Sequence, residues 1–103
     1  MDVATLIRGI KRFEWDEANR SHIAKHNVVP QEAEDVFFDP DNTLDEDIEH
    51  STVEKRFLII GKTKDERLLY QIFTIRGNKI RIVSSRNLNK KEVSLYEKKV
   101  SRS

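Results

Sequence analysis

The 103-residue sequence contains no cysteine, only three glycines and two prolines, and no long apolar run. Without cysteine, disulfides, thiolate zinc sites and cysteine nucleophiles are excluded, which is consistent with a reducing compartment. No stretch approaches the roughly 18 apolar residues that span a bilayer, and the first residues lack the features of a secretion signal. Phosphate-binding glycine loops and a nucleophile elbow are also absent. We therefore expect a cytoplasmic protein outside the common nucleotide-binding and serine-hydrolase classes.

A chain of this length forms one domain and can bury a modest core without covalent staples. Residues 1–12 show no clear hydrophobic period. We therefore expect a lead-in segment over residues 1–12 and a single domain over residues 13–103.

Charge is distributed unevenly, although the net charge is only +1. Residues 27–54 contain ten acidic residues and no Lys or Arg, whereas residues 55–103 contain fourteen basic and four acidic residues. The basic part suits a polyanion. Two alternatives stay open: the two parts neutralise one another within the fold, or the acidic segment docks a basic partner.

Two helices are predicted before the basic part. Asp16 is a suitable N-cap for the first helix, which is expected to run to about Lys25, and Asn27 can end it in the left-handed conformation. Pro30 suits the first turn of the second helix, and apolar residues follow at the spacing of a buried helical face. The acidic stretch after that helix predicts at most a short edge strand and a loop.

The basic part begins with a hydrophobic period of two, which predicts strands rather than helices. Gly77 and Asn78 supply a hairpin turn, because both residues accept a positive φ. An antiparallel meander is expected, with its central strand buried on both faces. Its three strands are predicted over residues 56–61, 68–75 and 80–85.

The closing segment predicts a helix, because Asn89 and Glu92 have the spacing of a capping box. Val93, Tyr96 and Val100 form one apolar stripe along it. The predicted fold class is α+β, with two N-terminal helices, an antiparallel sheet of three to five strands and a C-terminal helix.

Arginines are the clearest candidates for chemistry. Alternation along the third strand places Arg81 on the face opposite two isoleucines and places Ser85 beside it. Guanidinium groups match phosphate oxygens and keep their charge. If Arg56 and Arg86 converge with Arg81, they could bind an RNA backbone and stabilise charge at a scissile phosphate. The ordinary alternative is that Arg81 pairs with Glu54 or with a helix carboxylate.

Several side chains could transfer protons near these arginines. Tyr96 is either a core aromatic or a general acid. His22 and His26 have i, i+4 spacing, but no third ligand is indicated, so no metal site is predicted. One imidazole near the arginines could act as a general base, although His26 also suits a helix cap. Glu92 is expected to cap the last helix or to pair with Arg86.

Taken together, these segments resemble the BrnT-like toxins in order and spacing. Asn27 replaces a usual Gly, and Ser85 replaces an Ala. The resemblance covers about residues 13–98. The segments that carry it are residues 13–16 (F-E-W-D), 25–28 (K-H-N-V) and 80–86 (I-R-I-V-S-S-R), the spaced His50, Glu54 and Arg56, and a closing E-x-x-x-Y at Glu92 and Tyr96.

The resemblance implies a RelE-like fold and a ribonuclease toxin that inhibits translation. It also implies cleavage by attack of the RNA 2′-hydroxyl on the adjacent phosphorus, with no metal and no cofactor. The catalytic residues implied are Arg56, Arg81, Arg86, Tyr96 and His26. The RNA-binding residues implied are Arg56, Lys79, Arg81 and Arg86.

The partner that the resemblance implies is a co-encoded BrnA-like antitoxin with a ribbon-helix-helix domain. DNA would be contacted only through that antitoxin, and a toxin homodimer is possible within the complex. The alternative function is a non-catalytic RelE-like module that binds RNA or only its antitoxin.

Overall fold

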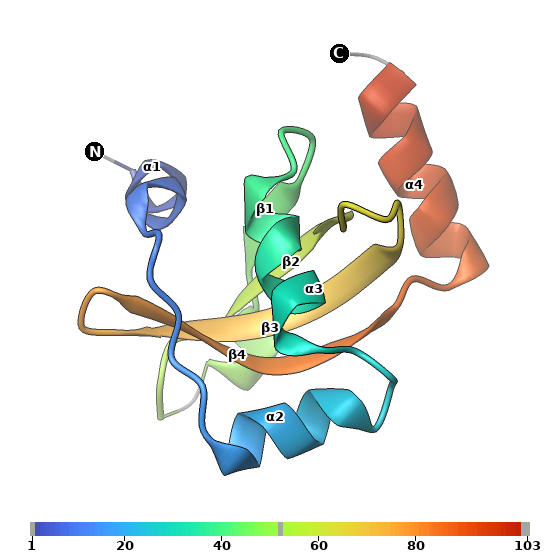
Figure 1. Ribbon diagram of the computed structural model, residues 1–103. Helices are drawn as coiled ribbons and strands as arrows, with labels where there is room; N and C mark the ends of the chain where they lie inside the picture. The colour runs from blue at the N-terminus through green and yellow to red at the C-terminus, as the bar shows by residue number, and fades with distance from the viewer. Residues whose placement is uncertain (1, 52, 102–103) are drawn as a thin grey trace.

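Four antiparallel strands in the order β1-β2-β3-β4 form the centre of the molecule in the computed structural model, which describes residues 2–51 and 53–101 (Figure 1). The α+β class with a C-terminal helix is therefore confirmed. The elements in chain order are α1 (Val3–Gly9), α2 (Glu17–Ala24), α3 (Pro30–Asp35), η1 (Val36–Phe38), β1 (Thr43–Glu46), η2 (Ile48–His50), β2 (Phe57–Lys62), β3 (Leu68–Arg76), β4 (Lys79–Asn87) and α4 (Lys90–Ser101).

Helix α2 begins and ends where the sequence predicts. The Asp16 side chain accepts a hydrogen bond from the Asn19 amide, and the Asn19 side chain accepts one from the Asp16 amide, which completes a capping box. Asn27 has a φ of 58°, so the predicted left-handed turn after α2 is confirmed.

A helix that the sequence did not predict, α1, lies within the first twelve residues. Asp2 caps it by accepting a hydrogen bond from the Thr5 amide, and Ile7 is only 3% exposed within the core. Because only one of its seven residues is buried, α1 lacks the repeated apolar spacing by which a helix is recognised in a sequence. The division of the chain after residue 12 stays a prediction.

The hydrophobic core lies between one face of the sheet and the helices α1, α2, α3 and η1. In Figure 1, α3 crosses in front of the sheet and α2 lies beside β4. We call this side of the sheet the core face. Its buried side chains are Phe57 and Ile59 from β2, Leu69 and Phe73 from β3, Ile80 and Ile82 from β4, and Ile7, Ile23, Val28, Ala33 and Val36 from the covering segments.

A β-bulge at Val83 interrupts the alternation of β4. Ile82 pairs with Phe73 and Ser84 pairs with Ile72, so Val83 is the extra residue. Beyond the bulge the faces exchange, and Ser85 points to the core face, where its hydroxyl donates to Gln71 at 2.8 Å. The prediction that Ser85 lies beside Arg81 was therefore wrong, because it assumed unbroken alternation.

The opposite side of the sheet, which we call the outer face, is not covered by any of the described helices. Its apolar side chains, including Leu58, Tyr70 and Ile72, are half-buried and lie outside the core cluster. The prediction that the central strand is buried on both faces was therefore wrong. The last helix, α4, could have covered this face, but it projects beyond one end of the strands (Figure 1).

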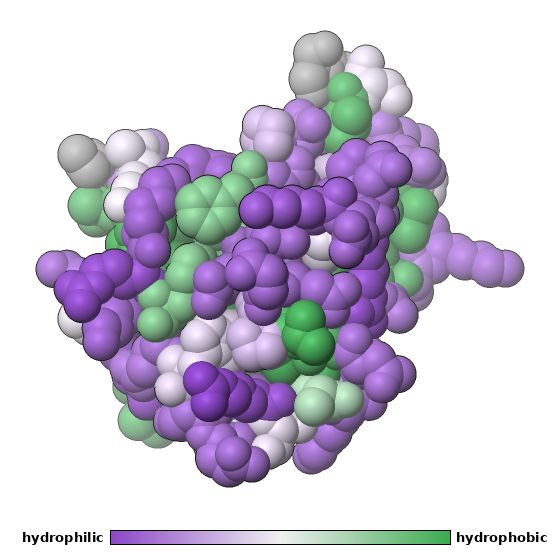
Figure 2. All heavy atoms as spheres, in the orientation of Figure 1, coloured by the Kyte–Doolittle hydropathy of each residue, from purple (hydrophilic) through white to green (hydrophobic). Residues whose placement is uncertain are grey.

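The helix-covered side of the molecule is largely hydrophilic in Figure 2, and its apolar residues form small separate patches. Val29 and Phe38 are among the large apolar side chains that are more than half exposed. Scattered exposed apolar residues of this kind are ordinary for a folded domain. Within the described ranges, none of the helices has the length and apolar character needed to cross a membrane.

Candidate functional site

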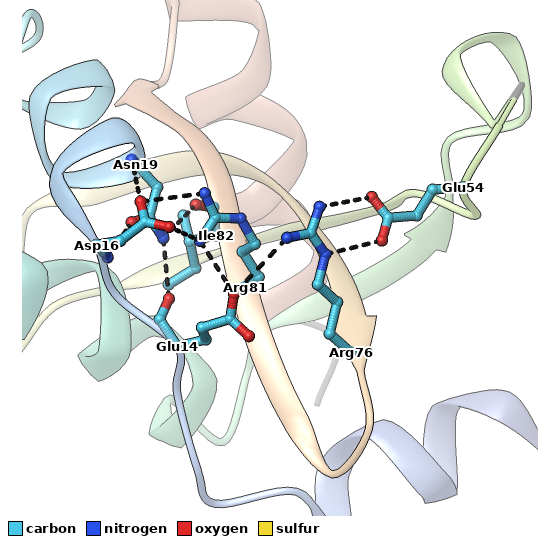
Figure 3. Close-up of polar contacts among 7 residues, drawn as sticks. All are labelled: Glu14, Asp16, Asn19, Glu54, Arg76, Arg81 and Ile82. Atoms are coloured by element: carbon cyan, nitrogen blue, oxygen red, sulfur yellow. Dashed lines mark hydrogen bonds and ion pairs between the residues drawn. The ribbon is translucent and has the colours of Figure 1, made fainter.

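Arg81 on β4 is held by two carboxylates that precede α2 (Figure 3). One guanidinium nitrogen lies 3.2 Å from Glu14 and 2.9 Å from Asp16, and the other lies 3.2 Å from the second Asp16 oxygen. The Arg81 side chain is only 12% exposed, whereas Asp16 is 54% exposed. Arg81 therefore pairs with the carboxylate that caps α2, which is one of the two pairings that the sequence left open. The other, with Glu54, is not formed.

A chain of alternating charges extends from Arg81 across the outer face. Arg76 lies 3.7 Å from Glu14 and 3.0 Å from Glu54, so the order is Glu54, Arg76, Glu14, Arg81 and Asp16 (Figure 3). Hydrogen bonds from Arg81 and from the Asn19 amide lower the pKa of Asp16. The hydrogen bond from Arg76 likewise lowers the pKa of Glu54. These carboxylates stay ionised at neutral pH and neutralise the arginines locally.

Arg56 and Lys79 lie at the same end of the sheet as Arg81. Thr74 pairs with Arg81 across the β3–β4 ladder, and its hydroxyl donates to the carbonyl of Lys55 at 2.9 Å. Arg56 follows directly and precedes β2, while Lys79 pairs with Arg76 beside the hairpin turn. We call this region the hairpin end of the outer face. It brings together three of the predicted residues: Arg56, Lys79 and Arg81.

A small cleft of about 200 Å³ opens beside Arg81, between α2 and β4. Its lining includes Asn19 and His22 from α2 and Val83 from the bulge. Asn19 fixes the two elements together, because its amide donates to the carbonyls of Glu14 at 2.9 Å and Ile82 at 3.2 Å. The sequence suggested an imidazole near the arginines and favoured His26, but His22 is the one in the cleft. Only the packing of α2 on β4 distinguishes the two.

Arg86 points to the same outer face as Arg81, but its ladder partner Tyr70 is four residues from Thr74, the partner of Arg81, so the two arginines lie about 13 Å apart at 3.3 Å per residue. Its guanidinium lies over the Tyr70 ring at 3.9 Å and forms two hydrogen bonds with Glu92, of 2.8 and 3.0 Å. Glu92 also accepts from the Asn89 amide, so both predicted roles of Glu92 are confirmed. The hydrogen bond from Arg86 lowers the pKa of Glu92. The structure therefore does not bring Arg86 together with Arg81.

Tyr96 is buried between α4 and the end of β2. Its hydroxyl donates to Asp39 at 2.8 Å, and Asp39 also accepts from the Lys62 amide at 2.8 Å. Burial, followed by the hydrogen bond to Asp39, raises the pKa of Tyr96. Leu68 pairs with Lys62, and it is six residues from Thr74, so Tyr96 lies roughly 20 Å from the Arg81 end of the sheet.

His26 lies on the exposed turn after α2, at the other end of β4. Its carbonyl accepts from Arg67 at 2.9 Å, and Arg67 also donates to Asn87 at 2.8 Å. Because Asn87 is six residues from Arg81 along β4, His26 is far from the hairpin end. The side chain of His50 lies outside the described part of the chain.

No metal-ligand cluster is found in the part of the chain that the structure describes. No group of three or more His, Cys, Asp or Glu side chains among those residues could hold a metal ion. A second cleft with titratable side chains, of about 470 Å³, lies beside α4 at the end of the sheet away from Arg81, and its lining includes Lys62, Glu66, Tyr96 and Glu97. A larger cleft of about 890 Å³ lies between α1 and the β3–β4 turn. Its lining contains no His, Asp or Glu; it consists of Thr5, Leu6, Gly9, Ile10, Lys11, Arg12, Ile75, Gly77 and Asn78.

Comparison with protein-family models matches residues 15–92 to the ribonuclease toxin BrnT of type II toxin–antitoxin systems. The matched range runs from the residue before the α2 cap to Glu92 in the first turn of α4. The chain belongs to the BrnT family. A comparison with curated proteins found no match.

Membership in the BrnT family makes the chain a ribonuclease toxin and gives it an antitoxin as a partner. The matched range contains both Arg81 and the cleft beside it, whereas Tyr96 and α1 lie outside that range.

Proposed function

We propose that this BrnT toxin cleaves RNA at the hairpin end of the outer face, by attack of a 2′-hydroxyl on the adjacent phosphorus and without a metal ion. The observation that carries the proposal is that Arg81 borders a cleft that also holds an imidazole. A guanidinium can stabilise the charge that develops on the phosphate oxygens in the transition state. The expected products are a 2′,3′-cyclic phosphate and a free 5′-hydroxyl.

Arg81 can bind a phosphate if Asp16, its more exposed partner, moves away from the guanidinium. Asp16 is 54% exposed, so its carboxylate can turn toward solvent while Glu14 stays on the same guanidinium nitrogen. A phosphate then occupies the two hydrogen-bonding positions that Asp16 vacates, in the bidentate geometry that guanidinium favours. Arg56 and Lys79 are proposed to bind neighbouring phosphates along the strand.

The remaining predicted residues are given other roles in this proposal. An RNA that follows the outer face beyond the cleft can also reach Arg86, which serves binding rather than the reaction. Tyr96 is proposed to hold α4 against the body through Asp39, because its hydroxyl proton is already donated there. His26 is proposed to have a structural role in the turn after α2, where its carbonyl accepts a hydrogen bond from Arg67.

The antitoxin is proposed to be a BrnA-like protein with a ribbon-helix-helix domain, and the toxin to act in the cytoplasm by cleaving RNA needed for translation. The uncovered outer face supports this, because half-buried apolar side chains lie there between two charged ends. Such a surface suits a protein partner that would also exclude RNA. DNA would then be contacted only through the antitoxin, in an assembly that can contain two toxin copies.

The experiment is cleavage of a short single-stranded RNA by the purified toxin, in buffer with and without EDTA, and with a matched substrate that carries 2′-deoxyriboses. Wild-type toxin is expected to cleave RNA equally in both buffers, to leave a 2′,3′-cyclic phosphate, and to spare the deoxy substrate. Cleavage of the deoxy substrate, a 3′-hydroxyl product or loss of activity in EDTA would each contradict the mechanism.

A second candidate is a BrnT-fold module that binds RNA or only its antitoxin. The observation that favours it is the neutralisation of Arg81 by two carboxylates. Growth arrest on expression distinguishes the two functions. The catalytic proposal expects arrest that Arg81→Ala relieves, whereas a binding module expects no arrest or an arrest that this change leaves intact.

A further inference from the structure

We infer that His22 is the catalytic base that accepts the proton of the attacking 2′-hydroxyl, opposite Arg81 in the cleft between α2 and β4. This inference rests on the proposed function, because it assigns one role in the same reaction. Its support is the shared lining of the cleft, since His22 from α2 and Arg81 from β4 both line a space of about 200 Å³.

The position of His22 suits a group that exchanges protons with a substrate. It lies on the exposed side of α2, and among the described residues its imidazole forms no hydrogen bond or ion pair. Imidazole both accepts and releases protons near neutral pH, which is what turnover requires. The neighbouring residue Asn19 is buried and bonded to two carbonyls, so the backbone that carries His22 is held firmly against β4.

The charged groups around His22 define its surroundings. Arg81 faces it from β4, and the segment before α2 contributes Glu14 and Asp16, both bonded to Arg81. Lys25, the C-cap of α2, and His26, in the turn after it, follow His22 by three and four residues. The imidazole is therefore near one guanidinium whose charge is already balanced by two carboxylates.

Other possible bases are excluded by position or by their bonds. Tyr96 lies roughly 20 Å from the Arg81 end of the sheet by strand spacing. His26 lies past the C-terminal end of α2, ten residues from the Asp16 that binds Arg81, or about 15 Å at 1.5 Å per residue. Glu14 and Asp16 are close to Arg81, but they accept its hydrogen bonds, and that bond lowers the pKa of Asp16. A carboxylate held in this way is a weak base. His22 is the described imidazole that the cleft contains.

The step balances without any further reactant. The 2′-oxygen forms a bond to phosphorus, and its proton passes to the neutral imidazole of His22. The bond between phosphorus and the 5′-oxygen breaks, and the leaving oxygen takes a proton from a water molecule. The imidazolium then returns its proton to the hydroxide that this water leaves behind. Arg81 stabilises the negative charge on the phosphate oxygens throughout.

The test is the single-turnover rate of RNA cleavage by purified full-length variants. His22→Ala and His22→Gln are expected to lower the rate by about 10² to 10⁴-fold, the usual contribution of a general base. Ser21→Ala is the matched control, because Ser21 is an exposed neighbour on α2 that only bonds Glu17. Added imidazole is expected to restore part of the rate of His22→Ala and to leave the rate of His22→Gln unchanged.

Binding is measured separately, with a non-cleavable RNA that carries 2′-O-methyl groups. His22→Ala is expected to keep its affinity within about threefold and to keep the wild-type melting temperature, because the side chain is exposed. A cleavage rate for His22→Ala within a few-fold of the Ser21→Ala rate would overturn the inference. A loss found in His26→Ala and not in His22→Ala would do so as well.

Failure of the inference is distinguishable from failure of the proposed function. If wild-type toxin leaves a 2′,3′-cyclic phosphate while His22→Ala cleaves normally, the reaction stands and the assigned base is wrong. If wild-type toxin does not cleave RNA or leaves a different product, the proposed function falls, and the assignment of His22 falls with it.

Discussion

Arg81 and Arg86 lie on the same strand, point to the same outer face and belong to the same seven-residue segment, yet their surroundings differ. Arg86 is bound by Glu92 six residues later and stacks on Tyr70, its partner in the β3–β4 ladder. Arg81 is bound by Glu14 and Asp16, which precede it by 67 and 65 residues. Arg86 therefore fixes the start of α4 locally, whereas Arg81 joins distant parts of the chain.

The difference shows why residue type alone does not identify a catalytic arginine. At the Arg86 end, both hydrogen-bonding partners and the aromatic face are supplied by the protein, so the guanidinium has a complete structural role. At the Arg81 end, one partner is exposed and a cleft with an imidazole adjoins the guanidinium. If the chemistry occurs at the Arg81 end alone, substitutions at the two ends should have unequal effects on RNA cleavage.

The largest expected effect is on the rate of RNA cleavage. Arg81→Ala should lower it by about 10² to 10³-fold, as expected for loss of a donor to a charged transition state, whereas Arg86→Ala should lower it less than about tenfold. Because Arg81 also joins β4 to the start of α2, Arg81→Lys provides a variant that keeps the charge. A larger loss in Arg86→Ala than in Arg81→Ala would reverse the comparison.

The next effect concerns the bulge that gives both arginines the same face. Ser85→Ala leaves the buried oxygen of Gln71 without its donor, so the free energy of unfolding should fall by about 1–3 kcal/mol. Ser84→Ala, on the outer face, should change it by less than about 0.5 kcal/mol. Urea denaturation measures both. Equal effects of the two substitutions would mean that β4 has no bulge at Val83.

A smaller effect is expected from the hydroxyl of Tyr96. Tyr96→Phe removes its hydrogen bond to Asp39 and should lower the free energy of unfolding by about 1 kcal/mol. Because Tyr96 is at the opposite end of the sheet from Arg81, the cleavage rate should stay within a few-fold of wild type. Retained stability combined with a hundredfold loss of cleavage would show that Tyr96 belongs to the reaction instead.

The smallest effect is the pH dependence of folding stability that the Arg86–Glu92 pair contributes. Because Arg86 lowers the pKa of Glu92 below 4.5 in the folded state, the pair stabilises the protein above that value and its contribution is lost as the pH falls through the folded pKa. The pair is partly exposed, so the loss should be a few tenths of a kcal/mol. Thermal unfolding at about pH 5 and about pH 3 measures it. Glu92→Gln should show a smaller decrease than wild type, and an equal decrease would contradict the assignment.

Most of the fold was predictable because its signals are local. The Asp16 cap, the left-handed Asn27 and the hairpin at Gly77 each depend on a few neighbouring residues, and all three are confirmed. Helix α1 was missed because a single buried residue, Ile7, gives no period. The open outer face was missed because alternation within a strand does not reveal whether a second layer exists.

The site was less predictable, because it depends on a bulge and on one helix packing against a strand. Arg81 and Arg86 are an odd number of residues apart, so unbroken alternation would place them on opposite faces. The extra residue Val83 puts both arginines on the same face, and the spacing of about 13 Å along the strand keeps them apart. The choice between His22 and His26 required the position of α2 against β4, which no motif in the sequence specifies.

The most direct test of where the reaction occurs is NMR titration of the toxin with a short RNA that carries 2′-O-methyl groups. The largest shifts are expected at the His22 imidazole and at the amides of Asn19, Arg81 and Val83, with smaller shifts at Tyr70 and Glu92. The largest shifts at Tyr70, Arg86 and Glu92, with His22 unchanged, would contradict the account and move the site to the other end of the sheet.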